Sequence, residues 1–147
     1  MTMGYVYADI EIVNFSQLDM ARRNLMDPDE VKRMRINVMV DTGALLLCIN
    51  GNIQSIFDFP FVRRERFELA DGSIAECDVV GSVEVIYGNR RTICEAFVLP
   101  GGSQPLLGAI PMEALNVFIH PQRQELFLDT KVALVPSIRP VGYLKGQ

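Results

Sequence analysis

The chain has 147 residues, 49% of them hydrophobic, and its 18 acidic and 14 basic residues give a net charge of −4 at pH 7. This length is typical of one domain, and the negative charge provides no field that would attract nucleic-acid phosphates or anionic lipids. We therefore predict a single domain over residues 1–147 that binds neither nucleic acid nor membranes. The high apolar fraction indicates surface that a partner chain would cover.

The N-terminal segment and the cysteines indicate the cellular compartment of the protein. Residues 1–13 carry two acidic residues and no basic one, unlike a secretory signal. No uncharged stretch reaches the ~20 residues that a membrane-spanning helix requires. Cys48, Cys77 and Cys94 are odd in number and lie in apolar runs, so we expect buried, reduced thiols. Together these features predict a soluble cytoplasmic protein.

The first predicted elements are two strands separated by a short helix. Apolar and polar residues alternate over residues 5–12, which predicts a half-buried strand. Ser16 and Asp19 have the spacing of a capping box, which predicts a helix over residues 17–25. A second alternating segment, residues 34–40, predicts a strand that ends immediately before an aspartate.

The middle of the chain is predicted to contain mostly strands. Residues 44–49 are continuously apolar and predict a buried strand, and residues 52–57 predict a short helix. Strand-like segments then follow one another over residues 61–99. Asp71-Gly72 is a favoured two-residue turn and predicts the tip of a hairpin. The other breaks expected in this region are Gly81 and Gly88-Asn89. The charged cluster at residues 63–66 is interpreted as a solvated face.

The last predicted elements are a short apolar strand, a short helix and two further strands. Residues 106–108 read Leu-Leu-Gly, and Pro111 is suited to be the first residue of a helix over residues 112–115. Residues 117–119 and 125–128 predict strands. The chain as a whole is predicted to be mainly β.

One tripeptide carries candidate catalytic chemistry. Asp41, at a predicted strand end, is followed by Thr42 and Gly43. Gly43 has no side chain, so its peptide N–H can approach the carboxylate, and the Thr42 hydroxyl can brace the loop. Two such carboxylates facing each other share one proton, so that one activates a water molecule and the other polarises a peptide carbonyl. The tripeptide is also an ordinary strand-end turn.

Three motifs give the chain a resemblance to the retropepsin-like aspartic proteases, especially to the small prokaryotic clan AA group. They are Val-Met-Val-Asp-Thr-Gly-Ala at 38–44, Leu-Ala-Asp-Gly-Ser at 69–73 and Leu-Leu-Gly-Ala-Ile-Pro-Met-Glu at 106–113. The resemblance implies a mainly β, single-lobe acid-protease barrel with one or two short helices and a hairpin flap. It implies an aspartic endopeptidase that acts on polypeptides as a homodimer, without a metal or cofactor, through a water activated by paired Asp41 carboxylates.

Site residues follow from the resemblance position by position. It assigns catalysis to Asp41, Thr42 and Gly43, with the Thr42 hydroxyl interlocking the active-site loops of the two subunits. Gly43 would also line the floor of the cleft. The implied substrate-binding residues are Ala44, Ala70, Asp71 and Gly72.

The sequence departs from the family pattern in three places. Ala109 follows Gly108 where retroviral enzymes have an Arg-Asp pair that braces the dimer. The predicted flap lacks both an aromatic residue and a glycine-rich tip. An insertion at about residues 17–33 precedes the catalytic strand, and an apolar C-terminal segment at about 131–147 is expected to contribute to the dimer interface. The alternative function is therefore a catalytically silent protein of this fold that binds peptides or partner proteins.

The sequence offers few residues for a serine-type, cysteine-type or metal-dependent catalytic site. His120 is the single histidine, so a serine-type or cysteine-type site has no general base besides it. We interpret it as the end of a strand. A zinc site needs clustered ligands, whereas the cysteines are widely spaced, so no metal site is predicted.

Overall fold

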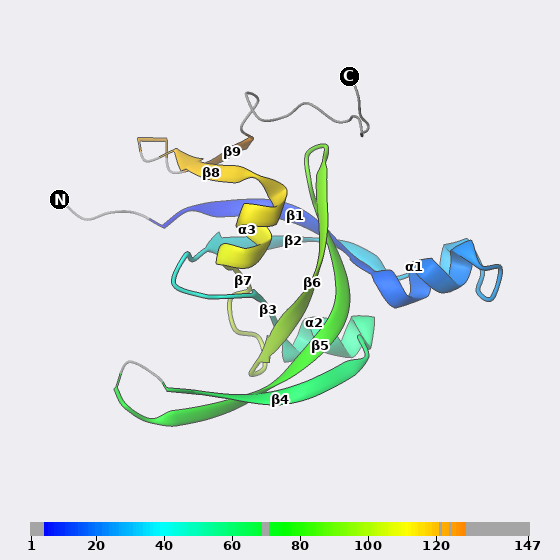
Figure 1. Cartoon of the computed structure of the whole chain (residues 1–147), viewed down its shortest axis with the longest axis horizontal. Coiled ribbons are helices and arrows are strands. Elements are labelled where there is room, and N and C mark those ends of the chain that lie inside the picture. Colours follow the sequence, from blue (N-terminus) through cyan, green and yellow to red (C-terminus); the bar gives the residue numbers. More distant parts are fainter. Residues whose placement is uncertain (1–4, 69–70, 121, 124, 129–147) are drawn as a thin grey trace, which may run out of the picture.

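The computed structural model describes residues 5–68, 71–120, 122–123 and 125–128. Within these residues the fold is mainly β, as the sequence predicted, and it contains a large mixed sheet (Figure 1). Ala70 and the C-terminal segment 131–147, both assigned roles above, lie outside the described residues. The strands are β1 (Tyr7–Asn14), β2 (Arg33–Val40), β3 (Leu47–Asn50), β4 (Phe61–Glu68), β5 (Ile74–Tyr87), β6 (Arg90–Leu99), β7 (Leu106–Leu107), β8 (Val117–His120) and β9 (Glu125–Leu128). The helices are α1 (Phe15–Arg22), the 3₁₀ helix η1 (Pro28–Glu30), α2 (Gly51–Phe57) and α3 (Ala109–Leu115).

The large sheet closes on itself. Its strand order is β1-β2-β7-β3-β6-β5-β4, and β1 also pairs with β5, so β4 lies outside the closed ring. β2 pairs with β7 in parallel and β3 pairs with β6 in parallel, whereas the other pairings are antiparallel. β8 and β9 form a separate two-stranded sheet. This closure brings β2, which ends at Val40 immediately before Asp41, beside β7.

The core follows from the alternation seen in the sequence. Ala8, Ile10 and Ile12 of β1 are buried, with the exposed Asp9 between the first two, and β2 buries Ile36 and Val38 in the same way. Burying an aliphatic side chain of this size contributes ~1.5–3 kcal/mol to the hydrophobic stabilisation. α2 closes one end of the core, where the rings of Phe57 and Phe59 stack with centroids 4.8 Å apart. The first two predicted strands are therefore confirmed.

The predicted helix near residues 17–25 exists, but its cap was assigned to the wrong residue. α1 begins at Phe15, and its N-cap is Asn14, whose side-chain oxygen accepts a hydrogen bond from the Gln17 amide at 3.1 Å. The Asn14 side chain is also buried and donates to the Phe57 carbonyl at 3.0 Å. This second bond ties the end of β1 to α2 and fixes the cap two residues before Ser16. α1 and η1 project from the closed sheet at the right of Figure 1.

Three further sequence predictions are corrected by the sheet pairing. The last residues paired across the β4–β5 hairpin are Glu68 and Ile74, so Asp71-Gly72 lies in a longer connection and is not a two-residue turn. Gly81 does not break the chain, because β5 runs through it, with a register shift between Val80 and Val83. The residues of the predicted 44–49 strand pair only from Leu47 onward. The expected break at Gly88-Asn89 is confirmed as the tight turn between β5 and β6.

The remaining correction concerns α3. The helix begins at Ala109 with Gly108 as its N-cap, so Pro111 is its third residue and not its first. The strands β8 and β9 are confirmed. Among the described residues, no helix is long and apolar enough to cross a membrane.

Candidate active site

Asp41 lies at the end of β2 in a loop held by backbone hydrogen bonds. Its amide donates to the Leu107 carbonyl of β7 at 3.0 Å, and its carbonyl accepts from the Ala44 amide at 3.0 Å. Its carboxylate oxygen Oδ1 accepts from the Gly43 amide at 2.9 Å, as the sequence predicted. These bonds fix both the position of the half-buried carboxylate and its orientation. The other oxygen, Oδ2, accepts no hydrogen bond from a described residue.

Gly43 and Thr42 have different surroundings. A Cβ atom on Gly43 would lie 3.1 Å from Asp41 Oδ1, so a side chain here would press on the carboxylate. The Thr42 side chain is exposed, and its hydroxyl forms no hydrogen bond with any described residue. Among the residues that the structure describes, this hydroxyl therefore does not brace the loop as the sequence predicted. Thr42 instead borders a cavity of about 360 Å³ together with residues of α3 and β8, including Met112 and Phe118.

The start of α3 closes over the Asp41 loop. The amide of Ala109 donates to the Ala44 carbonyl at 2.9 Å, and the amide of Ile110 donates to the Leu45 carbonyl at 3.0 Å. The approach is so close that a Cβ atom on Gly108 would lie 2.7 Å from the Ala44 carbonyl oxygen and would also collide with the Leu46 carbonyl oxygen. Only glycine fits at this position. The Leu-Leu-Gly segment is thus the support of the Asp41 loop.

A larger cavity, of about 620 Å³, is also lined by residues of this loop. The loop contributes Gly43 and Ala44, and the deepest lining residues are the buried Leu46 and Cys48. The remaining lining residues are Leu45, Arg63, Glu65, Glu95, Phe97, Leu99 and Ile110. The cavity is therefore bordered by the Asp41 loop, by the hairpin strand β4 and by β6.

The charged cluster in β4 has two faces. Arg63 and Glu65 line the large cavity, whereas Arg64 and Arg66 lie on the opposite face of the strand because successive side chains alternate. The sequence interpretation of this cluster as a solvated face holds, since the Arg63 and Glu65 side chains are 44% and 38% exposed, but it did not indicate that these two residues border a cavity. Strand alternation was the signal that could have separated the two pairs, once the neighbouring loop was known.

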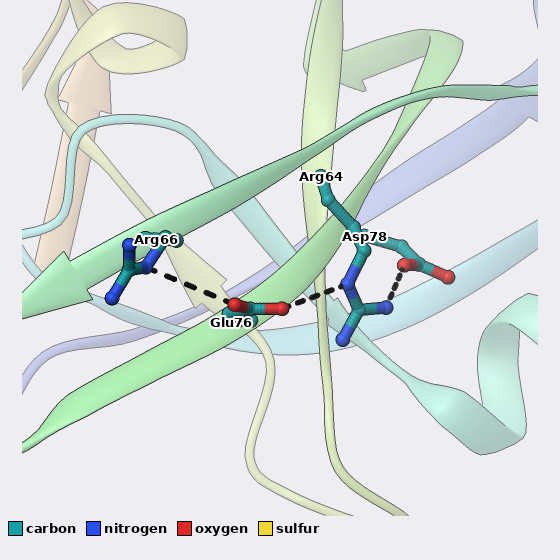
Figure 2. Close-up of polar contacts among 4 residues, drawn as sticks. All are labelled: Arg64, Arg66, Glu76 and Asp78. Atoms are coloured by element: carbon teal, nitrogen blue, oxygen red, sulfur yellow. Dashed lines mark hydrogen bonds and ion pairs between the residues drawn. The ribbon is translucent and has the colours of Figure 1, made fainter.

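The outer face of the hairpin carries a ladder of ion pairs (Figure 2). Arg64 donates to Asp78 at 2.6 Å and to Glu76 at 3.2 Å, and Arg66 lies 3.8 Å from the other Glu76 oxygen. Hydrogen bonding to Glu76 and the charge of Asp78 raise the pKa of Arg64. Because these charges pair across β4 and β5, they link the two strands of a hairpin that extends well beyond the closed sheet at the lower left of Figure 1.

The described part of the hairpin tip forms a local turn. Asp71 Oδ1 accepts from both the Ser73 hydroxyl at 2.6 Å and the Ser73 amide at 2.9 Å, and these bonds lower the pKa of Asp71. Gly72 has a φ of +85°, which favours glycine. Neither Asp71 nor Gly72 is among the lining residues of the large cavity. Of the three substrate-binding residues assigned by resemblance that the structure describes, Ala44, Asp71 and Gly72, it brings Ala44 alone to this cavity.

The three cysteines are free, and Cys48 and Cys77 are buried as predicted, whereas Cys94 is half-buried. Burial raises the pKa of Cys48 and of Cys94 to about 12, so both thiols stay protonated near neutral pH. A protonated thiol is a poor nucleophile, so Cys48 contributes an apolar wall to the cavity. His120 accepts a hydrogen bond from the Arg123 amide within a turn. No group of three potential metal ligands occurs among the residues that the structure describes.

Comparisons with known proteins assign no role to these residues. No protein-family model matches the sequence, and no curated protein matches it either. The chemistry of the Asp41 loop is therefore the basis for any function.

Replacing Gly108 by alanine should displace the Asp41 loop. The new methyl group would overlap backbone atoms of Ala44 and Leu46, which cannot rotate away as a side chain could. We expect the free energy of unfolding, measured in urea, to fall by about 1–3 kcal/mol. The matched control is Gly51→Ala, where the nearest atom lies 3.5 Å from the added Cβ atom, an ordinary contact. Equal stabilities of the two variants would contradict the close support of the loop by Gly108.

The turn at Asp71 should loosen as the solution is acidified. Because its pKa is lowered from the ordinary 3.8, the ionised carboxylate stabilises the turn above that pH, and this contribution is lost as pH falls through the lowered pKa. In an NMR titration, the Ser73 amide resonance should shift with a midpoint below 3.8, and Asp71→Asn should abolish that shift. A midpoint at or above 3.8 would show that the two hydrogen bonds from Ser73 do not stabilise the carboxylate.

Proposed function

We propose that this chain is one subunit of a homodimeric, retropepsin-like aspartic endopeptidase in which Asp41 supplies one of two catalytic carboxylates. The observation that carries the proposal is the Asp41 loop. Its carboxylate is oriented by the Gly43 amide at 2.9 Å, its backbone is held by β7 and α3, and a cavity of about 620 Å³ adjoins it. A rigid carboxylate beside an apolar cavity is what peptide hydrolysis by this chemistry needs.

The proposed mechanism uses the Asp41 carboxylates of two copies. Two carboxylates brought together cannot both ionise comfortably, so they share one proton. The ionised member removes a proton from a water molecule, and the protonated member donates a hydrogen bond to the peptide carbonyl. The Asp41 Oδ1 oxygen is already engaged by Gly43, which leaves Oδ2 to face the water molecule and the partner's proton.

A second copy is needed because the sequence contains one Asp-Thr-Gly and no Asp-Ser-Gly. The surface around the loop supports such pairing, since Leu45 is 59% exposed and Ile110 and Phe118 are each 43% exposed. In a twofold-symmetric dimer the same patch of each subunit meets its copy. The exposed Thr42 hydroxyl would then find its hydrogen-bond partner on the other subunit.

The arrangement of the strands supports the finer fold assignment within this proposal. A strand leading to Asp41, a long hairpin beside the cavity and a Leu-Leu-Gly segment leading into a helix occur in the order expected of a single-lobe acid-protease barrel. The hairpin β4–β5 is the proposed flap. We assign the whole chain, residues 1–147, to one domain. Its free thiols suit a reducing compartment such as the cytoplasm.

Asp41→Asn should abolish peptide cleavage while preserving the fold and the dimer, because an amide of equal size cannot share the proton. We expect the cleavage rate of a diverse peptide library, followed by mass spectrometry, to fall by about 100- to 10,000-fold or more. The matched control is Asp58→Asn at an exposed site after α2, where the backbone is left-handed and suits asparagine. This control should cleave as fast as the parent.

Two other results would contradict the catalytic proposal in different ways. Cleavage by Asp41→Asn at the parent rate would remove Asp41 from the mechanism. Peptide binding without cleavage by the parent chain, at acidic and neutral pH, would favour the alternative of a binding protein. The sequence of the proposed flap motivates that alternative, because it lacks both an aromatic residue and a glycine-rich tip.

A further inference from the structure

We propose that the large cavity beside Asp41 is a specificity pocket for a long basic side chain of the peptide, a lysine or an arginine. The inference rests on the proposed function and extends it to the class of substrate. It depends on three features of the cavity: its position, its apolar interior and the net charge of its rim.

The position of the cavity follows from the residues that the Asp41 loop contributes to it. Gly43 and Ala44 line it and lie two and three residues from the carboxylate that would act on the scissile bond. A side chain of a peptide bound at Asp41 would therefore enter this cavity from a residue near the cleaved bond. The cavity volume of about 620 Å³ is sufficient for the longest side chains.

The interior of the cavity suits an aliphatic stem. Leu46 and Cys48 are buried at its floor, and Phe97, Leu99 and Ile110 supply further apolar wall. Lysine and arginine bury their methylene groups against apolar surface while the charged group remains near water. An interior of this kind accepts three or four methylene groups without leaving a polar atom unpaired.

The rim of the cavity carries one cation and two anions. The Arg63 Nε atom lies 2.7 Å from Glu65 Oε1, and the Arg63 Nη1 atom lies 2.8 Å from Glu95 Oε1. Both hydrogen bonds raise the pKa of Arg63, and the bond with Glu65 has the larger effect. One guanidinium against two carboxylates leaves a net charge of −1 at the rim. Each carboxylate uses its Oε1 atom for Arg63, so each Oε2 atom can accept another donor.

This charge arrangement distinguishes three kinds of substrate side chain. A lysine ammonium can donate to the remaining carboxylate oxygens, while Arg63 holds those carboxylates in place. An uncharged chain of the same length gains the apolar contact alone. A glutamate meets the like charges of Glu65 and Glu95. Because these two side chains are 38% and 40% exposed, solvent screens the interaction, and we expect a moderate preference.

The test starts from the peptide library, which gives the position relative to the cleaved bond where basic residues are enriched. Three peptides are then compared that carry lysine, norleucine or glutamate at that position and are otherwise identical. We expect kcat/KM for lysine to exceed that for norleucine about tenfold, as for one additional charge-assisted hydrogen bond, and glutamate to be the poorest. Norleucine matches the lysine stem, so this ratio isolates the charge.

Substitutions of the two rim carboxylates test whether the preference for lysine arises at this cavity. Glu95→Gln and Glu65→Gln should each lower the lysine-to-norleucine ratio to about threefold or less, since each removes one negative charge from the rim. The matched control is Glu76→Gln, which removes a carboxylate from the outer face of the same hairpin and should keep the tenfold ratio. Cleavage without a lysine preference, or a preference that both rim variants retain, would overturn the proposal.

A binding measurement separates this proposal from the catalytic one. The Asp41→Asn chain is titrated with the hexapeptides acetyl-Ala-Ala-Lys-Ala-Ala-Ala-amide and its norleucine counterpart, and amide shifts of Cys48 and Phe97 are followed by NMR. We expect the lysine peptide to bind several-fold more tightly. If this difference in binding is observed although the parent chain cleaves no peptide, the pocket is supported and the endopeptidase proposal is wrong. If neither cleavage nor a difference in binding is observed, both fall.

Discussion

The structure around Asp41 depends on one backbone contact, the passage of Gly108 against the loop that follows β2. The Leu107 carbonyl of β7 accepts a hydrogen bond from the Asp41 amide. The first two amides of α3 donate hydrogen bonds to the carbonyls of Ala44 and Leu45. Buried backbone groups need such partners, and here they come from a segment more than sixty residues away in the sequence. The contact therefore depends on the large sheet, because β7 lies between β2 and β3 and pairs with both, and these strands precede and follow the loop.

This support explains how an exposed loop can hold a carboxylate in one orientation. The backbone bonds leave little freedom at Asp41, and the Gly43 amide fixes one of its oxygens. The same arrangement leaves Thr42 and the apolar side chain of Leu45 at the surface, where they are available to another molecule. The backbone groups of the loop therefore have partners within the chain, whereas the side chains of Thr42 and Leu45 are exposed, and on this basis we propose a site shared between two copies.

Local sequence patterns predicted the strands and the Asp41 turn. The features that they did not predict depend on contacts between residues far apart in the sequence. The alternation in β1 and β2 and the lack of a side chain at Gly43 were sufficient for those features. The cap at Asn14 depends on a bond to α2, and the place of Arg63 at the border of the cavity depends on the loop beside it. Neither partner is near in sequence, so Ser16 was a reasonable but wrong cap, and the sequence did not indicate that Arg63 and Glu65 border a cavity.

The central claim is that one site requires the Asp41 carboxylates of two chains, and subunit mixing tests it most directly. Parent chains are denatured and refolded with an equal amount of Asp41→Asn chains, and peptide cleavage is measured per total protein. Random pairing leaves both carboxylates in about a quarter of the dimers, so the account predicts about one quarter of the parent activity. Independent sites in each chain would retain about one half, and that value, or cleavage by a monomer in light scattering, would contradict the shared site.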